Sequence, residues 1–310
     1  MNLLPVLAEK ARAAAHPEAG QAPCTCDAGP APLADRPDAT VVRHAGTVAK
    51  AHAPGTDPAE LALRLGTAAR VPGVLLAPLA PGPTPLHGRL VTFWPYGTPV
   101  DPDDPDAAPW ETVGTLLARL HRTVPPAGLP PMRGPAKATR AMRRLHEALR
   151  GEPHEAAGPV QRAWAALPAW ARAEAAMPGP AVLCHGDVHL GQLVRHPAPD
   201  GPWQLIDVDD LGVGVPAWDL ARPAAWYACG LLPPDVWTRF LTAYRRAGGP
   251  AVPADGDPWP ALDVPARALT VQTAALAVAK ALAADRPLDE VEQAVVDACA
   301  RMTSVPYPTS

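Results

Sequence analysis

The sequence predicts an α+β protein with two lobes, a small and mostly antiparallel sheet followed by a larger, mainly helical part. Short apolar runs separated by turn signals precede the Pro- and Asp-rich segment 99–109, and apolar residues at helical spacing dominate after it. A strand-rich segment, residues 181–219, interrupts the helical part. We therefore place one lobe at residues 1–98 and the other at residues 99–310, and expect a ligand cleft between them.

The N-terminal lobe is expected to hold a small sheet with one helix. A His-Ala-Gly turn separates two runs of β-prone residues, which is a hairpin signal. The expected elements are a loop or poorly defined edge structure over 17–37, hairpin strands at 40–43 and 47–50, a helix from Asp57 or Pro58 that ends before Pro72, and strands at 74–76 and 89–94.

Helical periodicity defines the C-terminal lobe. Apolar residues fall on one helical face at Trp110, Val113, Leu116, Leu117 and Leu120. Further helices are expected over 135–150, 156–175, 233–247, 260–284 and 288–303.

Composition excludes several classes of protein. The chain has 310 residues, 48% of them apolar and 19% charged, which suits a globular protein with a sizeable core and not a disordered one. The formal net charge of −4 argues against a nucleic-acid binder. The most apolar stretch, residues 268–284, contains Gln272 and Lys280, so we expect no membrane partner. No basic region precedes the short apolar run at the N-terminus, so we expect no signal peptide and a cytoplasmic location.

The five cysteines are scattered and odd in number, which is typical of reduced thiols. The sequence Cys24-Thr25-Cys26 is the one local pair that could touch a metal. Because no second Cys/His pair follows at a spacing that zinc sites use, we expect no metal there.

Carboxylates and an amide follow the apolar runs of the segment 181–219. Asp187 comes soon after one run, Gln192 lies five residues later, and Asp207 ends the strand 203–206. Phosphoryl transfer needs such a set, because one carboxylate deprotonates the acceptor hydroxyl while oxygen ligands hold magnesium across the nucleotide phosphates. The kinase catalytic loop has the same order and spacing of base, amide and later Asp.

With these residues in view, the chain resembles the aminoglycoside phosphotransferase-like kinase family. The resemblance rests on the motifs HGDVHLGQ (185–192), ID (206–207) and WDLA (218–221), and it extends over residues 40–300. It implies a protein-kinase-like fold that uses ATP or GTP with Mg²⁺. Gln192 departs from the commoner Asn, although the maltokinase-like sugar kinases of the superfamily have a similar loop.

The resemblance also assigns roles to individual residues. Asp187 would be the catalytic base, and Asp207 with Gln192 would hold magnesium. Asp219 would brace the catalytic loop through backbone hydrogen bonds. Apart from the resemblance, we expect His185 to organise that loop by hydrogen bonding.

A second set of residues resembles the nucleotide site of kinases. Lys50 resembles the strand lysine that contacts nucleotide phosphates, and Glu60, early on the next helix, is its expected partner; a surface lysine is the alternative. The segment containing Trp94 and Tyr96 resembles the hinge whose backbone bonds adenine, although an ordinary strand end would look the same. A glycine-rich phosphate loop is missing before Val41.

Other interpretations remain open at this stage. His185, Asp187 and His189 alternate, as a transition-metal site would require; otherwise His189 organises the loop or lines the acceptor site. Asp209 and Asp210 are expected to be solvated loop residues, or else to assist magnesium or meet a cationic substrate. A pseudokinase-like binding module without chemistry is a further alternative.

We therefore expect a magnesium-dependent kinase that transfers the γ-phosphate of ATP or GTP to a hydroxyl of a small molecule. An aminoglycoside or other antibiotic is the lead acceptor, and a sugar or amino sugar is the alternative.

Overall fold

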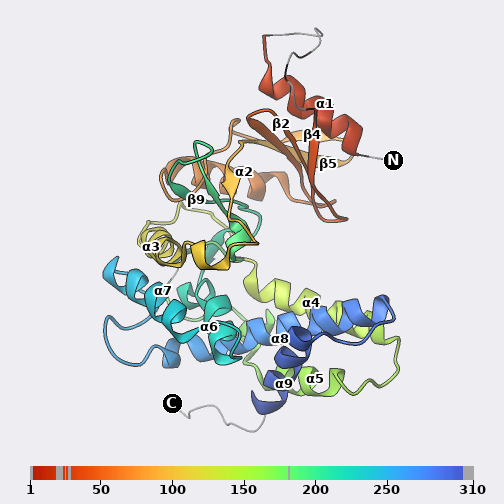
Figure 1. Ribbon diagram of the computed structural model, residues 1–310, viewed down its shortest axis with the longest axis vertical. Helices are drawn as coiled ribbons and strands as arrows, with labels where there is room; N and C mark the ends of the chain where they lie inside the picture. Colours follow the sequence, from red (N-terminus) through yellow and green to blue (C-terminus); the bar gives the residue numbers. More distant parts are fainter. Residues whose placement is uncertain (1–2, 19–23, 25, 27–28, 181, 303–310) are drawn as a thin grey trace. The chain divides into compact units, whose positions relative to one another are not determined.

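The computed structural model describes residues 3–18, 24, 26, 29–180 and 182–302 (Figure 1). The chain forms two compact units, which we describe one at a time. Unit 1 comprises the described residues of Met1–Ala108, Pro126–Pro130 and His189–Asp209, and unit 2 comprises the rest. The expected α+β class is confirmed, with antiparallel strands concentrated in unit 1 and helices in unit 2.

The main sheet of unit 1 is antiparallel, and its described strands pair in the order β1-β2-β3-β5-β4. The predicted hairpin is present, with Val41 opposite Lys50 and His44 opposite Thr47. Hydrogen bonds between Arg36 and Ala39 close a turn without glycine between β1 and β2. The strands are β1 (Ala31–Asp35), β2 (Thr40–His44), β3 (Thr47–Ala51), β4 (Thr84–Leu86) and β5 (Arg89–Pro95).

Two elements near the N-terminus were not predicted. Helix α1 (Leu4–Ala15) lies against the sheet (Figure 1) and buries Leu7 and Ala11 in a core cluster with β2, β3 and β5. The expectation for 17–37 is a loop or poorly defined edge structure, and residues 31–35 form a regular strand, β1, at the edge of the sheet. Residues 19–23, 25, 27 and 28 of that segment lie outside the described residues. Strand β1 is mostly exposed, so it lacks the apolar alternation that identifies a strand in sequence.

A second sheet joins residues 189–209 to unit 1. Its described strands pair in the order β6-β8-β9, and Leu205 also forms a parallel bridge to Leu75. Because of this pairing, residues 189–209 belong to unit 1, although the sequence places them in the C-terminal lobe. The strands are β6 (Thr98–Pro99), β8 (Leu193–Arg195) and β9 (Trp203–Leu205), and helix α2 (Pro58–Arg70) completes the unit.

Unit 2 is built around the long helix α8, which contacts α4, α5, α6 and α9. The predicted helices are present, although the one expected over 156–175 ends at Ala166 because Pro168 follows. The helices are α3 (Trp110–His121), α4 (Gly134–Leu149), α5 (Ala157–Ala166), α6 (Ala221–Ala228), α7 (Pro234–Arg246), α8 (Trp259–Ala283) and α9 (Glu290–Met302). Short strands β7 (Val182–Cys184) and β10 (Gly212–Gly214) pair beside the loop that carries Asp187. Across the described ranges, none of these helices is both long and apolar enough for a bilayer.

Candidate active site

One buried carboxylate accepts hydrogen bonds from the backbone of the loop that follows β7. Asp219 is only 1% exposed, and its Oδ2 and Oδ1 accept hydrogen bonds from the backbone N–H groups of His185 (2.6 Å) and Gly186 (2.8 Å). Bonds to an ionised acceptor are about twice as strong as neutral ones. Asp219 thus fixes the main chain immediately before Asp187.

A relay of buried side chains orients Asp219 in turn. His121 on α3 contacts Asp219 Oδ2 through Nε2 (3.0 Å) and the Tyr244 hydroxyl through Nδ1 (2.8 Å), and that hydroxyl accepts the backbone N–H of Ala251 (2.9 Å). Burial raises the pKa of Tyr244, so its hydroxyl stays protonated. Because an ionised carboxylate only accepts hydrogen bonds, the Nε2–H of His121 donates to Asp219. Sequence reasoning missed both residues, because no local motif marks them.

Glycine is required at position 186. Its φ is +84°, a left-handed conformation that L side chains rarely adopt, and an added Cβ would lie 2.4 Å from the carbonyl oxygen of Asp210. The glycine of the His-Gly-Asp motif therefore allows the chain to turn directly before the candidate base.

Two cations flank the Asp187 carboxylate. Lys137 Nζ lies 2.5 Å from Oδ2 and Arg222 Nη2 lies 3.1 Å from Oδ1. Lys137 also binds Asp210 Oδ2 at 2.8 Å. Burial lowers the pKa of Lys137, but Asp210 and Asp187 outweigh that effect and raise it. Asp210 is therefore an ion-paired residue of unit 2, which corrects the expectation of a solvated loop residue.

Lys137 and Arg222 were not singled out from the sequence. A signal for Lys137 was present, because the chain has only four lysines (10, 50, 137 and 280) among 27 basic residues. Two of these four, at positions 50 and 137, pair with the candidate carboxylates.

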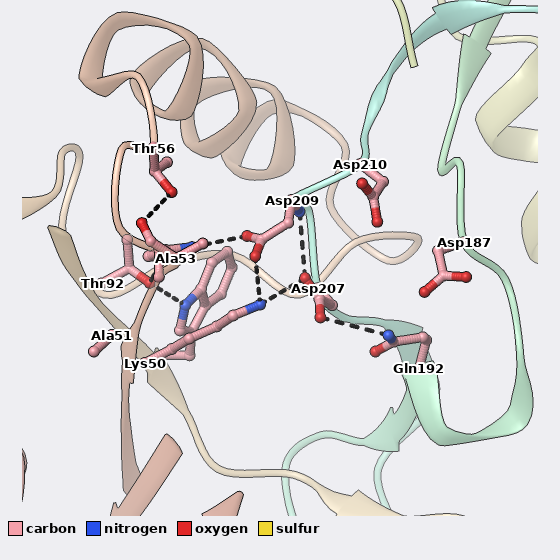
Figure 2. A network of polar contacts seen from close by, with 12 residues as sticks. Lys50, Ala51, Ala53, Thr56, Thr92, Asp187, Gln192, Asp207, Asp209 and Asp210 are labelled. Atoms are coloured by element: carbon pink, nitrogen blue, oxygen red, sulfur yellow. Dashed lines mark hydrogen bonds and ion pairs between the residues drawn. The ribbon is translucent and has the colours of Figure 1, made fainter. Parts of the chain in front are cut away.

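In unit 1, Lys50 on β3 binds two carboxylates that follow β9. Its Nζ lies 2.6 Å from Asp207 Oδ1 and 3.0 Å from Asp209 Oδ2 (Figure 2). The lysine side chain is only 10% exposed, so it is not a surface lysine. The expected pairing with Glu60 is wrong: Glu60 lies in the first turn of α2 and pairs with Arg64 one turn later, at 3.0 Å.

Asp209 is held at the centre of this network. Burial raises its pKa, but the Lys50 ammonium and then His52 lower it far more, so that the net pKa lies well below the usual range. His52 Nδ1 is 2.8 Å from Asp209 Oδ1 in a polar contact without hydrogen-bond alignment. For Lys50, burial lowers the pKa, but the charges of Asp207 and Asp209 outweigh burial and raise it above its usual value. Asp209 is therefore not a solvated loop residue either.

Oxygen-bearing side chains of unit 1 meet at Asp207. Gln192 Nε2 lies 3.5 Å from Asp207 Oδ2, and Figure 2 shows the two side chains pointing toward one another. Asp207 has a φ of +65°, an uncommon conformation that Asp tolerates better than most residues. A carboxylate and an amide oxygen form a donor set that suits Mg²⁺, and here the amide nitrogen of Gln192 faces Asp207. His189 Nδ1 accepts the N–H of Gly191 (3.1 Å), which fits the loop-organising role, and its place at the acceptor site stays a prediction.

The segment containing Trp94 and Tyr96, which resembles a kinase hinge, forms hydrogen bonds with other residues of unit 1. The Trp94 ring is buried, and its Nε1–H donates to Thr92 Oγ1 (2.9 Å). The Tyr96 N–H donates to the Gly46 carbonyl (2.7 Å), and His196 Nδ1 donates to the Tyr96 carbonyl (3.1 Å). Adenine binding at Trp94 and Tyr96 stays a prediction, and at Tyr96 it would have to displace these bonds.

Solved structures with the same fold are small-molecule kinases by their descriptions. A choline/ethanolamine kinase family protein from Mesorhizobium loti is 19% identical, covers 94% of this chain and 92% of its own, and has a TM-score of 0.56. An aminoglycoside phosphotransferase from Streptomyces rimosus is 19% identical, with coverages of 84% and 97% and a TM-score of 0.53. A spectinomycin phosphotransferase in complex with ADP and spectinomycin is 13% identical, with coverages of 91% and 90% and a TM-score of 0.56. These likenesses confirm the kinase-like fold.

Comparison at the sequence level gives the family. No curated protein matches the chain. A family model described as the phosphotransferase enzyme family matches residues 39–262, which include every candidate residue of both units named above. The chain is a small-molecule phosphotransferase, and it belongs to the phosphotransferase enzyme family.

Proposed function

We propose that the protein transfers the γ-phosphoryl group of ATP or GTP to a hydroxyl of a small molecule. The acceptor oxygen bonds to the γ-phosphorus, the bond from that phosphorus to the β–γ bridging oxygen breaks, and the nucleoside diphosphate leaves. The observation that carries the proposal is the Lys50–Asp207 ion pair of 2.6 Å, which joins two residues 157 positions apart that were assigned to one nucleotide site from separate motifs.

Asp187 is the proposed base that takes the proton of the acceptor hydroxyl. Its loop is fixed by Asp219, and Lys137 with Arg222 holds each carboxylate oxygen in place. Both oxygens of Asp187 therefore have cationic partners, which argues against the transition-metal alternative with His185 and His189.

Lys50, Asp207 and Gln192 are the proposed nucleotide and magnesium ligands. The donor set fits Mg²⁺, since Asp207 offers a carboxylate and Gln192 an amide group beside it; the Gln192 nitrogen faces Asp207 here, and a rotation of the amide would present its oxygen to the ion. When bound, the ion would neutralise phosphate oxygens. Lys50 is now bonded to Asp207, so we propose that nucleotide binding draws its ammonium from Asp207 to the phosphates. Asp209 would keep Lys50 aligned during that exchange, because it binds the same ammonium at 3.0 Å.

An aminoglycoside or other antibiotic is the proposed acceptor. The family model and the descriptions of the aminoglycoside and spectinomycin phosphotransferases favour it. A sugar or amino sugar is the second candidate, because Gln192 stands where this family more often has Asn, and the choline/ethanolamine kinase likeness adds amino alcohols to the compounds worth testing.

A coupled assay of nucleoside diphosphate release tests the proposal. The panel comprises aminoglycosides, other antibiotics, hexoses, amino sugars and amino alcohols, each with ATP and GTP. We expect Asp187→Asn to lower kcat by about a thousandfold and to leave nucleotide affinity within about threefold. Asp207→Asn should abolish the magnesium dependence of nucleotide binding.

Asp235→Asn is the matched control, because that carboxylate is 74% exposed on α7 and should tolerate the same change. Turnover of Asp187→Asn at the wild-type rate would refute the base assignment. Nucleotide-induced thermal stabilisation without turnover on any acceptor would favour the binding-module alternative.

A further inference from the structure

Two cysteines and two histidines gather at one end of the main sheet of unit 1. His16 directly follows α1, Cys24 and Cys26 follow in the next segment, and His44 is the last residue of β2. One ligand atom from each of the four side chains lies within 4.8 Å of the other three. None of these residues belongs to the phosphotransferase site.

The closest contacts are those of ligands around a common centre. Cys24 Sγ lies 3.1 Å from His16 Nε2 and 3.4 Å from His44 Nε2, and Cys26 Sγ lies 3.2 Å from His16 Nε2. In a tetrahedral zinc site, bond lengths of about 2.3 Å to sulfur and about 2.05 Å to nitrogen place these atoms about 3.6 Å apart. The observed separations are slightly shorter, so small outward shifts would admit an ion.

Hydrogen bonding alone does not account for the cluster. His16 Nε2 meets two sulfurs, and Cys24 Sγ meets two imidazole nitrogens. A ring nitrogen holds at most one proton or one lone pair in the ring plane, so it cannot serve both sulfurs well. A single cation would satisfy all four atoms at once.

Burial and a backbone contact of the cluster also fit a metal site. His44 is only 3% exposed, so its ligand nitrogen lies away from bulk water. The backbone N–H of Cys26 donates to Cys24 Sγ at 3.2 Å, as outer-shell donors do at metal ligands.

We propose that His16, Cys24, Cys26 and His44 bind a structural Zn²⁺ ion. Two thiolates and two imidazoles in a closed tetrahedral set are a zinc donor set, because soft sulfur ligands disfavour Mg²⁺ and Ca²⁺. The ion links the C-terminal end of α1 to the end of β2, whose hairpin partner β3 carries Lys50. The site thus stabilises the sheet and takes no part in the chemistry.

This proposal departs from the expectation that Cys24-Thr25-Cys26 binds no metal. The ligands follow the pattern His-x7-Cys-x-Cys-x17-His, in which each histidine comes from a different element. The tertiary packing of α1 on β2 supplies the second pair, and no spacing rule would have found it.

Metal analysis of the full chain tests the proposal. The protein is expressed with zinc in the medium, freed of any oligohistidine tag, dialysed against a weak chelator and measured by mass spectrometry for metals. We expect about one zinc per chain in the wild type and in Cys229→Ser, and near zero in the double variant Cys24→Ser/Cys26→Ser. Cys229 is the matched control because it is a partly exposed thiol outside the cluster.

Cobalt substitution gives a readout that requires no variant to fold. Chelator-stripped wild-type protein titrated with Co²⁺ should show the ligand-field bands of a tetrahedral ion and a thiolate charge-transfer band, and Zn²⁺ should abolish both. The proposal is overturned if reduced wild-type protein binds neither ion, if its cobalt spectrum is octahedral, or if the double variant retains the zinc of the wild type. The proposal is also overturned if the protein, purified with zinc under reducing conditions, is metal-free and contains a Cys24–Cys26 disulfide.

Discussion

Replacing Asp219 with asparagine tests the loop-bracing role most directly. Three N–H groups converge on its two oxygens, from His185, Gly186 and His121. Asparagine offers one oxygen and one NH₂ group. If the NH₂ replaces Oδ2, His121 can adapt by moving its proton to Nδ1, but the His185 N–H loses its acceptor. If it replaces Oδ1, the Gly186 N–H loses its acceptor instead.

Either arrangement therefore leaves one buried backbone N–H without an acceptor, which costs about 1–3 kcal/mol. The remaining bonds lose their ionic character, for about 1 kcal/mol more. We expect Asp219→Asn to lower the free energy of unfolding by about 3 kcal/mol. Because the orphaned group lies within two residues of Asp187, displacement of the base should lower kcat by about a hundredfold. Nucleotide affinity should change little, since the proposed nucleotide ligands lie in unit 1.

Urea denaturation followed by circular dichroism, together with steady-state kinetics, measures both effects. Tyr244→Phe is the informative companion, because it removes the hydroxyl at the far end of the relay and leaves the Asp219 bonds to His185 and Gly186 intact. It should cost about 1–3 kcal/mol of stability with less than about a tenfold loss in kcat. The reasoning is refuted if Asp219→Asn unfolds within about 0.5 kcal/mol of the wild type, or if Tyr244→Phe lowers kcat as much as Asp219→Asn does.

Three further outcomes are expected. Gly186→Ala should lose activity and at least about 2 kcal/mol of stability, because φ is +84° and the new methyl group meets the Asp210 carbonyl; wild-type kinetics would contradict this. Lys50→Met should abolish nucleotide binding by calorimetry and destabilise the fold by about 2 kcal/mol at pH 7, a value between those of surface and buried ion pairs. Since Lys50 depresses the pKa of Asp209, this stabilisation is complete above the unfolded pKa of 3.8 and is lost as the pH falls further. Since the same carboxylates raise the pKa of Lys50, the stabilisation is also lost as the pH rises above the unfolded lysine pKa of 10.5, so the gap between variant and wild type should narrow in urea titrations below pH 4 and above pH 10.5 and stay constant between them. Burial raises the pKa of Cys299 from 9.0 to about 12, so its contribution to stability is complete below pH 9 and falls as the pH rises through about 12; alkylation at pH 8 mapped by mass spectrometry should label Cys299 only after unfolding.

Periodicity and turn residues were sufficient for most elements of the fold. The β2–β3 hairpin, strand β5 and helices α2, α3, α4, α7 and α9 carry their apolar positions at the spacing of the element, and α8 is marked by apolar residues on nearly all of its faces. Helix α1 and strand β1 were missed because tertiary contacts define them: β1 is exposed, and α1 shows its buried face only against the sheet.

The sequence by itself established the class of reaction. Phosphoryl transfer requires a base, an amide and a second carboxylate at restricted spacing, and those residues lie in contiguous motifs. Only the tertiary structure decided which side chains pair with each charged group. Lys50 pairs with Asp207 and Asp209 and not with Glu60, Lys137 and Arg222 flank Asp187, and His16 and His44 join two cysteines. Ion pairs and metal sites depend on distances of a few ångströms between side chains from remote segments, and local sequence patterns contain no information about such distances.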